Sequence, residues 1–171
     1  MEAALKTPRT KVHAEAPDCL ADSLAWLISQ AYYGIGNEVR GAFEPLDVSA
    51  RGYHVLAAAL DGDGELTQIE LSNLLGLDKT TMVVTIDELE EAGLAERRPS
   101  AKDRRARVLK VTKEGERMVQ KGDEVIASVQ KDVLATLPAG DRKVFLDSLG
   151  TIVKERMGES PNCSKPLRRR S

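Results

Sequence analysis

Apolar residues recur at helical spacing along most of the chain and predict a series of helices separated by short turns. The first long helix is expected after Asp18, which is placed to cap it. Beside its main apolar stripe lies a second stripe, which consists of Asp22, Trp26 and Tyr33. This helix therefore needs two other surfaces to pack against, one for each stripe. The main stripe comprises Leu20, Leu24, Leu27, Ile28, Ala31, Ile35 and Val39.

Three shorter helices follow, each with a capping residue. Ser49 is expected to cap a helix with Tyr53, Leu56, Ala57 and Leu60 on its inner face. Thr67 and Glu70 have the T-x-x-E spacing of a capping box, and that helix stops at Gly76. Asp78 then caps a helix that ends at Gly93 and turns Met82, Ile86 and Leu89 inward. The tight link at residues 76–78 is typical of a helix-turn-helix.

A hairpin and two more helices complete the predicted order. Residues 94–98 read as a strand, 99–103 as a turn and 107–111 as a return strand, with Leu94, Val108 and Val111 pointing inward. One long helix is expected over residues 113–137, and Pro138 ends it before a last helix over about 139–157. The fold class is therefore mainly α, with a small β hairpin (α+β).

Positive charge is concentrated in the hairpin. Between Gly93 and Lys113 there are eight Lys/Arg and two acids, a net of +6: Arg97, Arg98, Lys102, Arg104, Arg105, Arg107, Lys110 and Lys113 against Glu96 and Asp103. The chain carries 25 Lys/Arg and 27 Asp/Glu, so the remainder has 17 against 25, a net of −8. A basic loop on an acidic protein is typical of a surface that binds phosphates.

The composition of the chain argues against several classes of protein. Aromatic residues make up 4% of the chain, which argues against a stacking platform for single strands. No apolar run is long enough for a membrane helix, and no signal peptide is expected at the N-terminus. Cys19 and Cys163 lie far apart in sequence and form neither a disulfide framework nor a metal-binding spacing, which fits a reducing cytoplasm. No catalytic spacing, phosphate loop or metal cluster is present, so we expect no enzyme, cofactor or metal.

The motifs together resemble the MarR family of bacterial transcription regulators over about residues 48–115. The resemblance rests on G-L-D-K-T-T-M-V, L-E-x-x-G-L-A-E-R-R, D-R-R and V-T-x-E-G, in that order. It implies a winged helix-turn-helix whose N- and C-terminal helices interleave as a two-fold dimerisation platform. The expected segments are a flexible arm (1–17), a dimerisation helix (18–47), the winged helix-turn-helix (48–113), C-terminal dimerisation helices (114–157) and a disordered basic tail (158–171).

The predicted DNA contacts lie on the second helix of the helix-turn-helix and on the wing. With Met82, Ile86 and Leu89 inward, the outward set is Lys79, Thr80, Thr81, Val84 and Thr85. Thr67, Gln68 and Lys102 complete the predicted set, with Arg98, Arg104 and Arg107 on phosphates. The resemblance implies that Asp103 orients the wing tip and that Arg105 enters the minor groove. Many MarR-like sequences carry Arg near position 84, and its absence favours thymine-methyl or shape readout.

The resemblance also implies the partners. They are double-stranded DNA with a pseudo-palindromic operator, a second copy of the chain, and a small anionic or aromatic effector, with repression as the default outcome. The effector is expected between the dimerisation platform and the winged domain. Its candidate ligands are Trp26, Tyr33, Arg40, Tyr53 and His54, each of which also has a purely structural interpretation.

Two alternatives remain open at this point. Residues 59–70 partly match a calcium-binding loop, but Ala59 occupies the first ligand position, where a carboxylate is needed. A calcium-binding or protein-interaction helical module is therefore the alternative from another class. A redox branch of the family uses a cysteine near the start of the first helix. The second alternative is therefore a redox-sensing regulator that acts through Cys19. When the chain is aligned with that branch, however, the cysteine position falls on Ala25, and Cys19 lies nearly two helical turns earlier.

Overall fold

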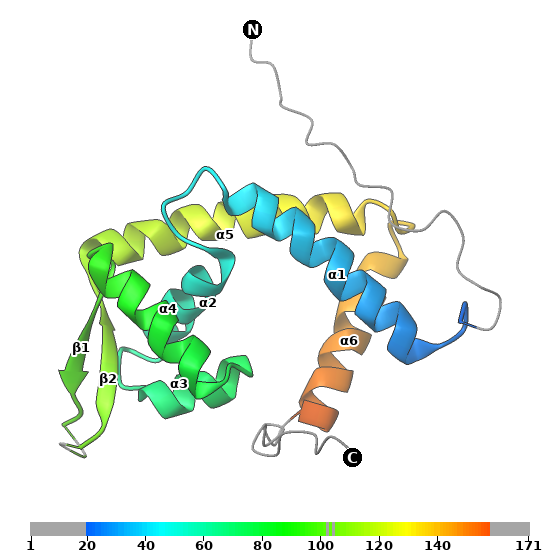
Figure 1. The fold of residues 1–171 in the computed structure, drawn as a ribbon. Helices are drawn as coiled ribbons and strands as arrows, with labels where there is room; N and C mark the ends of the chain where they lie inside the picture. The colour runs from blue at the N-terminus through cyan, green and yellow to red at the C-terminus, as the bar shows by residue number, and fades with distance from the viewer. Residues whose placement is uncertain (1–19, 102, 104, 158–171) are drawn as a thin grey trace, which may run out of the picture.

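The computed structural model describes residues 20–101, 103 and 105–157. Within them the chain forms six helices and one hairpin (Figure 1). The helices are α1 (Leu24–Phe43), α2 (Ala50–Asp61), α3 (Gln68–Leu75), α4 (Lys79–Glu91), α5 (Lys113–Leu134) and α6 (Asp141–Met157); the strands are β1 (Ala95–Pro99) and β2 (Arg107–Val111). The mainly α prediction with a single small sheet is confirmed.

The hydrophobic core lies where α2, α3, α4, the hairpin and the first turns of α5 meet. Leu56, Leu71, Ile86 and Leu109 are completely buried there, one from each of four different elements. Full burial of a side chain of this size contributes about 1.5–3 kcal/mol. These long-range contacts fix α3 and α4 as a unit against the hairpin.

The predicted caps of the helix-turn-helix are confirmed. The Thr67 hydroxyl accepts a hydrogen bond from the Glu70 amide, and the Glu70 carboxylate accepts one from the Thr67 amide. Gly76 ends α3 with a φ of 63°, a left-handed conformation that glycine adopts without steric cost. Asp78 then accepts the Thr81 amide at 3.0 Å and starts α4. Local hydrogen bonds therefore set the angle between the two helices.

The hairpin pairs in antiparallel register from Ala95 with Val111 to Pro99 with Arg107. Thr67 adds one isolated antiparallel bridge to Val108. Val108 and Leu109 are both buried, although they point to opposite faces of the hairpin. Both faces of β2 are therefore covered at its centre.

Three predictions of element detail need correction. The first helix begins at Leu24, capped by Ser23, because Leu20 lies in a turn whose carbonyl accepts the Ser23 amide; Asp18 lies outside the described residues. Leu60 is 37% exposed, while Val55 and Ala59 are fully buried, because α2 packs against α4 and β2 as well as α5. The long helix ends at Leu134 instead of Leu137.

The helices α1 and α6 keep large apolar side chains exposed. On α1 these include Leu24, Ile28 and Tyr33, and on α6 they include Phe145, Leu149 and Ile152. Figure 1 shows α5 running from the hairpin to the far end of the molecule, where α6 turns back from it and α1 lies beside it. Within residues 20–101, 103 and 105–157, no helix has the length and apolar character that crossing a bilayer requires.

Candidate nucleic-acid interface

The first turns of α4 present a small, weakly polar surface. Lys79, Thr80 and Val84 are exposed, and Val83 is 37% exposed. Thr81 is half-buried, and its hydroxyl donates to the Asp78 carboxylate at 2.5 Å. The hydroxyl and amide of Thr81 hold the pKa of Asp78 below its usual range. Thr81 is thus part of the helix cap, and the side chains that project from this surface are those of the other three residues and Val83.

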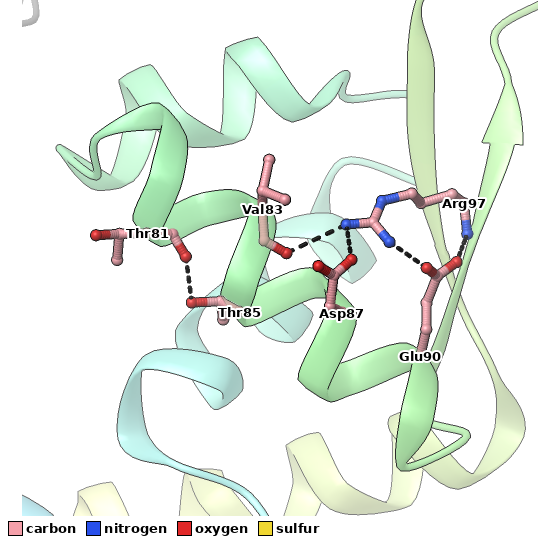
Figure 2. Close-up of polar contacts among 6 residues, drawn as sticks. All are labelled: Thr81, Val83, Thr85, Asp87, Glu90 and Arg97. Atoms are coloured by element: carbon pink, nitrogen blue, oxygen red, sulfur yellow. Dashed lines mark hydrogen bonds and ion pairs between the residues drawn. The ribbon is translucent and has the colours of Figure 1, made fainter.

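The placement of Thr85 on the outward face is wrong. Thr85 is completely buried, and its hydroxyl donates to the Thr81 carbonyl at 2.8 Å (Figure 2). It belongs with Met82, Ile86 and Leu89, since positions three and four apart share one face of a helix. The hydroxyl is satisfied within the helix, which allows a polar residue to occupy a core position.

At the start of α3, the polar groups of Thr67 are used in capping the helix. The Thr67 hydroxyl exchanges hydrogen bonds with Glu70, donating at 2.8 Å and accepting at 3.2 Å. Gln68 is half-buried, and its amide nitrogen has no hydrogen-bond partner among the described residues. These two predicted residues lie at the end of α3 that pairs with β2, and neither places a fully exposed side chain there.

The wing tip is held by Asp103. Its carboxylate accepts the backbone amide of Arg105 at 2.9 Å, and its carbonyl accepts the amide of Ala106 at 3.0 Å. Both bonds close the turn and leave the Arg105 side chain exposed. Arg107 is exposed at the start of β2. The predicted residues Lys102 and Arg104 lie outside the described residues.

Arg97 of β1 points back at α4, which the sequence did not indicate. Its guanidinium forms ion pairs with Glu90 and with Asp87, the latter at 2.6 Å, and donates to the Val83 carbonyl at 3.2 Å. Its backbone amide donates to Glu90 as well, at 2.6 Å. Figure 2 shows all three acceptors along one side of α4. Arg97 therefore binds the adjacent helix in the free protein.

Two further basic residues of the hairpin are paired within the chain. Arg98 contacts Glu96 at 2.7 Å, with 63% of its side chain exposed. The Lys110 ammonium contacts Glu65 at 3.2 Å and the Asp63 carbonyl at 2.9 Å. The net positive charge of the hairpin is thus offset along its length, and Arg105 and Arg107 mark its exposed basic end.

The Lys110 contacts also bear on the turn that partly matches a calcium loop. Here the ammonium lies on the carbonyl of Asp63 and the carboxylate of Glu65, while Glu70 closes the capping box of α3. Among the described residues, no group of three His, Cys, Asp or Glu side chains is arranged to hold a metal ion. The carboxylates of Glu65 and Glu70 thus have structural partners.

The five candidate effector residues do not converge in one protomer. Tyr53 is buried, donates from its hydroxyl to Asp123 at 2.6 Å, and lies 5.1 Å from the His54 ring. His54 is exposed on α2 and only partly covered, with its ring tilted against that of Tyr53. Arg40 donates to Asn37 at 3.0 Å, Tyr33 is exposed and Trp26 is half-buried, all on α1.

One groove includes a predicted effector residue. It has a volume of about 490 Å³ and lies where the end of α1, the start of α2 and the end of α4 meet. Its lining includes Arg40, Phe43, Asp47, Ser49, Glu88 and Leu94. Apolar and charged side chains both line the groove, and Glu88 and Leu89 of α4 are among them.

Comparisons with known proteins agree with the fold. The MarR family model matches residues 46–106. The chain is similar to a MarR-family transcriptional regulator from Rhodococcus sp. RHA1, at 26% identity and a TM-score of 0.73 over 80% of this chain and 96% of that chain. It is also similar to the transcriptional repressor CouR bound to a 23-mer DNA duplex, at 25% identity and a TM-score of 0.72 over 82% and 99% of the two chains.

A third likeness is to CouR from Rhodococcus jostii RHA1 bound to p-coumaroyl-CoA, at 26% identity and a TM-score of 0.69 over 80% of this chain and 95% of that chain. The capped helix-turn-helix, β1 and the wing tip lie within the matched region, which ends just before β2. The chain thus resembles the MarR family of winged-helix regulators in sequence over residues 46–106 and in fold over 80% of its length.

Proposed function

We propose that this protein is a transcriptional repressor that binds a pseudo-palindromic DNA operator as a homodimer and is released by a small effector. The observation that carries the proposal is the pairing of two exposed surfaces, the first turns of α4 and the basic end of the wing at Arg105. A helix of this kind fits a major groove about 12 Å wide, and arginine suits a narrow minor groove.

The side chains available on α4 favour contacts with thymine methyl groups. Val83 and Val84 are exposed and apolar, and Thr80 adds a methyl and a hydroxyl group. Within α4, no arginine is present to read guanine with two hydrogen bonds. Operators with thymines at the positions facing α4, flanked by A·T-rich steps at the wings, are therefore expected.

Exposed apolar faces on α1 and α6 support the homodimer. The described residues of α6 are exposed except for a half-buried Arg142, and Val144, Phe145 and Val153 are among its large apolar side chains. So many large exposed apolar side chains on two helices are typical of surfaces that bind a partner. A two-fold pairing of α1 and α6 would present two winged units, with half-sites about 34–36 Å apart.

The proposed effector is an anionic or aromatic compound. CouR has been solved both with DNA and with p-coumaroyl-CoA, an aromatic thioester. In this chain the groove beside Arg40 has apolar lining residues such as Phe43 and Leu89 that suit an aromatic ring, and its charged lining residues are Arg40, Glu44, Asp47 and Glu88. Dimer formation would bring Trp26 and Tyr33 of α1 against a partner surface, which can complete a site that one protomer lacks.

Fluorescence anisotropy tests the DNA proposal. The protein is titrated onto duplexes from its own upstream region and onto scrambled duplexes between 50 and 200 mM salt. A regulator with six to ten phosphate contacts should lose about 10³–10⁵ in affinity over that range. Arg105→Gln should weaken binding, whereas Arg117→Gln, an equal charge change on α5, should not. Absence of binding to any duplex at low salt would refute the proposal.

The same assay tests the effector. Aromatic carboxylates and their CoA thioesters are added to the preformed complex, and release of the duplex is followed by the fall in anisotropy. Release that saturates with concentration would support the proposal. A complex that resists every compound of both classes would contradict the effector chemistry while leaving the DNA proposal intact.

A further inference from the structure

We propose that Arg97 is a positioning residue of the DNA-binding surface: it fixes the wing to the recognition helix α4 and does not itself bind phosphate. The consequence for DNA rests on the proposed function, whereas the mechanical role can be measured in the free protein. The proposal separates Arg97 from the other arginines of the hairpin, with which its position in the sequence groups it.

The guanidinium is engaged on three sides. It contacts Asp87 at 2.6 Å, forms a second ion pair with Glu90, and donates to the Val83 carbonyl at 3.2 Å. Only 22% of the side chain is exposed. An arginine fork held by two carboxylates and a carbonyl has most of its donors occupied. Binding a phosphate would require breaking contacts that are partly shielded from water.

The three acceptors form a stripe along α4. Val83, Asp87 and Glu90 are spaced by four and three residues, which places them one above another on one face of the helix. The Glu90 carboxylate also accepts the Arg97 backbone amide at 2.6 Å, so both the side chain and the main chain of β1 are attached. This arrangement fixes both the distance and the rotation of the strand relative to α4.

Arg97 also offsets negative charge beside the exposed surface of α4. Asp87 is 52% exposed and lies one turn beyond Val83 and Val84. A carboxylate there would repel the phosphates of a bound duplex. Asp87, Glu90 and Arg97 together carry a net charge of −1, whereas the two acids alone would carry −2. The Arg97 side chain therefore both positions β1 on α4 and reduces the negative charge beside the exposed surface of α4.

Arg98 provides a matched comparison on the same strand. It is adjacent, carries the same charge and pairs with one acid, Glu96, at 2.7 Å, but 63% of its side chain is exposed. Its guanidinium donates two hydrogen bonds, both to Glu96 of the same strand. Replacing either arginine with glutamine removes one positive charge from the wing, so a difference between the two variants reports the contacts and not the charge.

We call the contacts of Arg97 with Val83, Asp87 and Glu90 the Arg97 clamp. Hydrogen exchange of the free, full-length protein tests this clamp directly. Arg97→Gln should speed exchange of the β1 and β2 backbone amides at least about tenfold, because several charge-assisted hydrogen bonds are lost. The Arg97 amide itself should show the largest change. Arg98→Gln should leave these amides as in the wild type. Arg97→Lys, which keeps the charge but lacks the fork, should give an intermediate rate.

Far-UV circular dichroism establishes that each variant keeps its helices. If Arg97→Gln does not fold, the double variant Asp87→Asn, Glu90→Gln takes its place, since it removes the same contacts from the other side. The clamp predicts that this double variant and Arg97→Gln have similar wing exchange, and that combining all three changes adds little. Unchanged wing exchange in folded variants would overturn the proposal.

DNA affinity provides the second measurement. Arg97→Gln should weaken binding to the upstream duplex about tenfold more than Arg98→Gln does. Wild-type affinity in Arg97→Lys, which keeps the charge but lacks the fork, would mean that charge alone matters and would overturn the positioning role. If the wild-type protein binds no duplex, the proposed function fails, and the exchange measurement still decides whether Arg97 clamps the wing.

Discussion

The Tyr53 hydroxyl donates a 2.6 Å hydrogen bond to Asp123, and the tyrosine ring lies directly over Gly122. This contact joins α2, a helix of the core beneath the helix-turn-helix, to the middle of α5. The ring also packs on Phe43 at the end of α1, with 5.3 Å between ring centroids. One tyrosine therefore ties three helices together where the winged part meets the long helix.

Replacing Gly122 with alanine should destabilise the protein. A Cβ at this position would overlap the Tyr53 ring, and overpacking of a closed site costs about 1–3 kcal/mol. Chemical denaturation measures the loss. In a Tyr53→Leu background, which removes the ring, Gly122→Ala should cost much less, and equal costs in the two backgrounds would show that the ring is not the obstacle.

Thr85→Val should leave DNA binding unchanged. The Thr85 side chain is buried and its hydroxyl is used within α4, so it cannot reach a duplex. Thr80→Val, by contrast, changes an exposed residue of the same type and should reduce the proposed operator affinity. The two variants are compared by anisotropy at one salt concentration. A loss for Thr85→Val equal to that for Thr80→Val would contradict the burial argument.

Calcium should not stabilise the protein. In the turn after α2, the Lys110 ammonium contacts the Asp63 carbonyl and the Glu65 carboxylate, and Glu70 is committed to its cap. Thermal melts with and without about 1 mM calcium, a concentration that occupies even weak calcium loops, should coincide. Magnesium serves as the control for general ionic effects. A rise in Tm with calcium alone would revive the calcium-loop alternative.

Stability should fall as pH is lowered through the ordinary range of histidine. Partial burial of His54 lowers its pKa, so the unfolded chain takes up a proton that the folded chain resists. The folded state therefore loses stability as pH drops below about 6.5, until His54 also protonates in the folded chain. Denaturation at several pH values should show a shallower dependence for His54→Gln than for the wild type. Identical dependences would exclude His54 as the cause.

A charge on the apolar face of α6 should dissociate the proposed dimer. Phe145 is 45% exposed, and burying such a side chain at an interface contributes about 1.5–3 kcal/mol. Phe145→Glu should therefore raise the dimer Kd at least about tenfold in sedimentation experiments. Lys143→Glu, a charge reversal at a site that is 84% exposed on the same helix, should remain a dimer.

The caps and the order of elements could be predicted because they depend on residues close in sequence. Thr67 with Glu70 and Asp78 with Thr81 are each three residues apart, and both pairs form the predicted bonds. The helical boundary at Asp18 was wrong since several polar residues near that end can cap a helix, and the choice of Ser23 depends on the preceding turn.

The errors at the candidate site have two origins. The outward placement of Thr85 conflicts with its local spacing, because Thr85 lies three residues after Met82 and four before Leu89, on the inner face of the helix. The Arg97 contacts could not be predicted, because they depend on which face of β1 meets α4. The seven-residue separation of Glu90 and Arg97 across Gly93 is the one local signal that could have suggested them.

The junction between β2 and α5 consists of the single residue Thr112. Its hydroxyl donates to the Gly93 carbonyl at 2.8 Å and accepts the Gly115 amide at 3.1 Å, while its own amide donates to the Leu94 carbonyl. The wing is thus joined without slack to a helix of 22 residues, about 33 Å long. In the proposed dimer, α5 would act as a lever arm. A few degrees of tilt at the end beside α6 would become a displacement of ångströms at the wing, so the gap between two operator half-sites would be set far from the DNA.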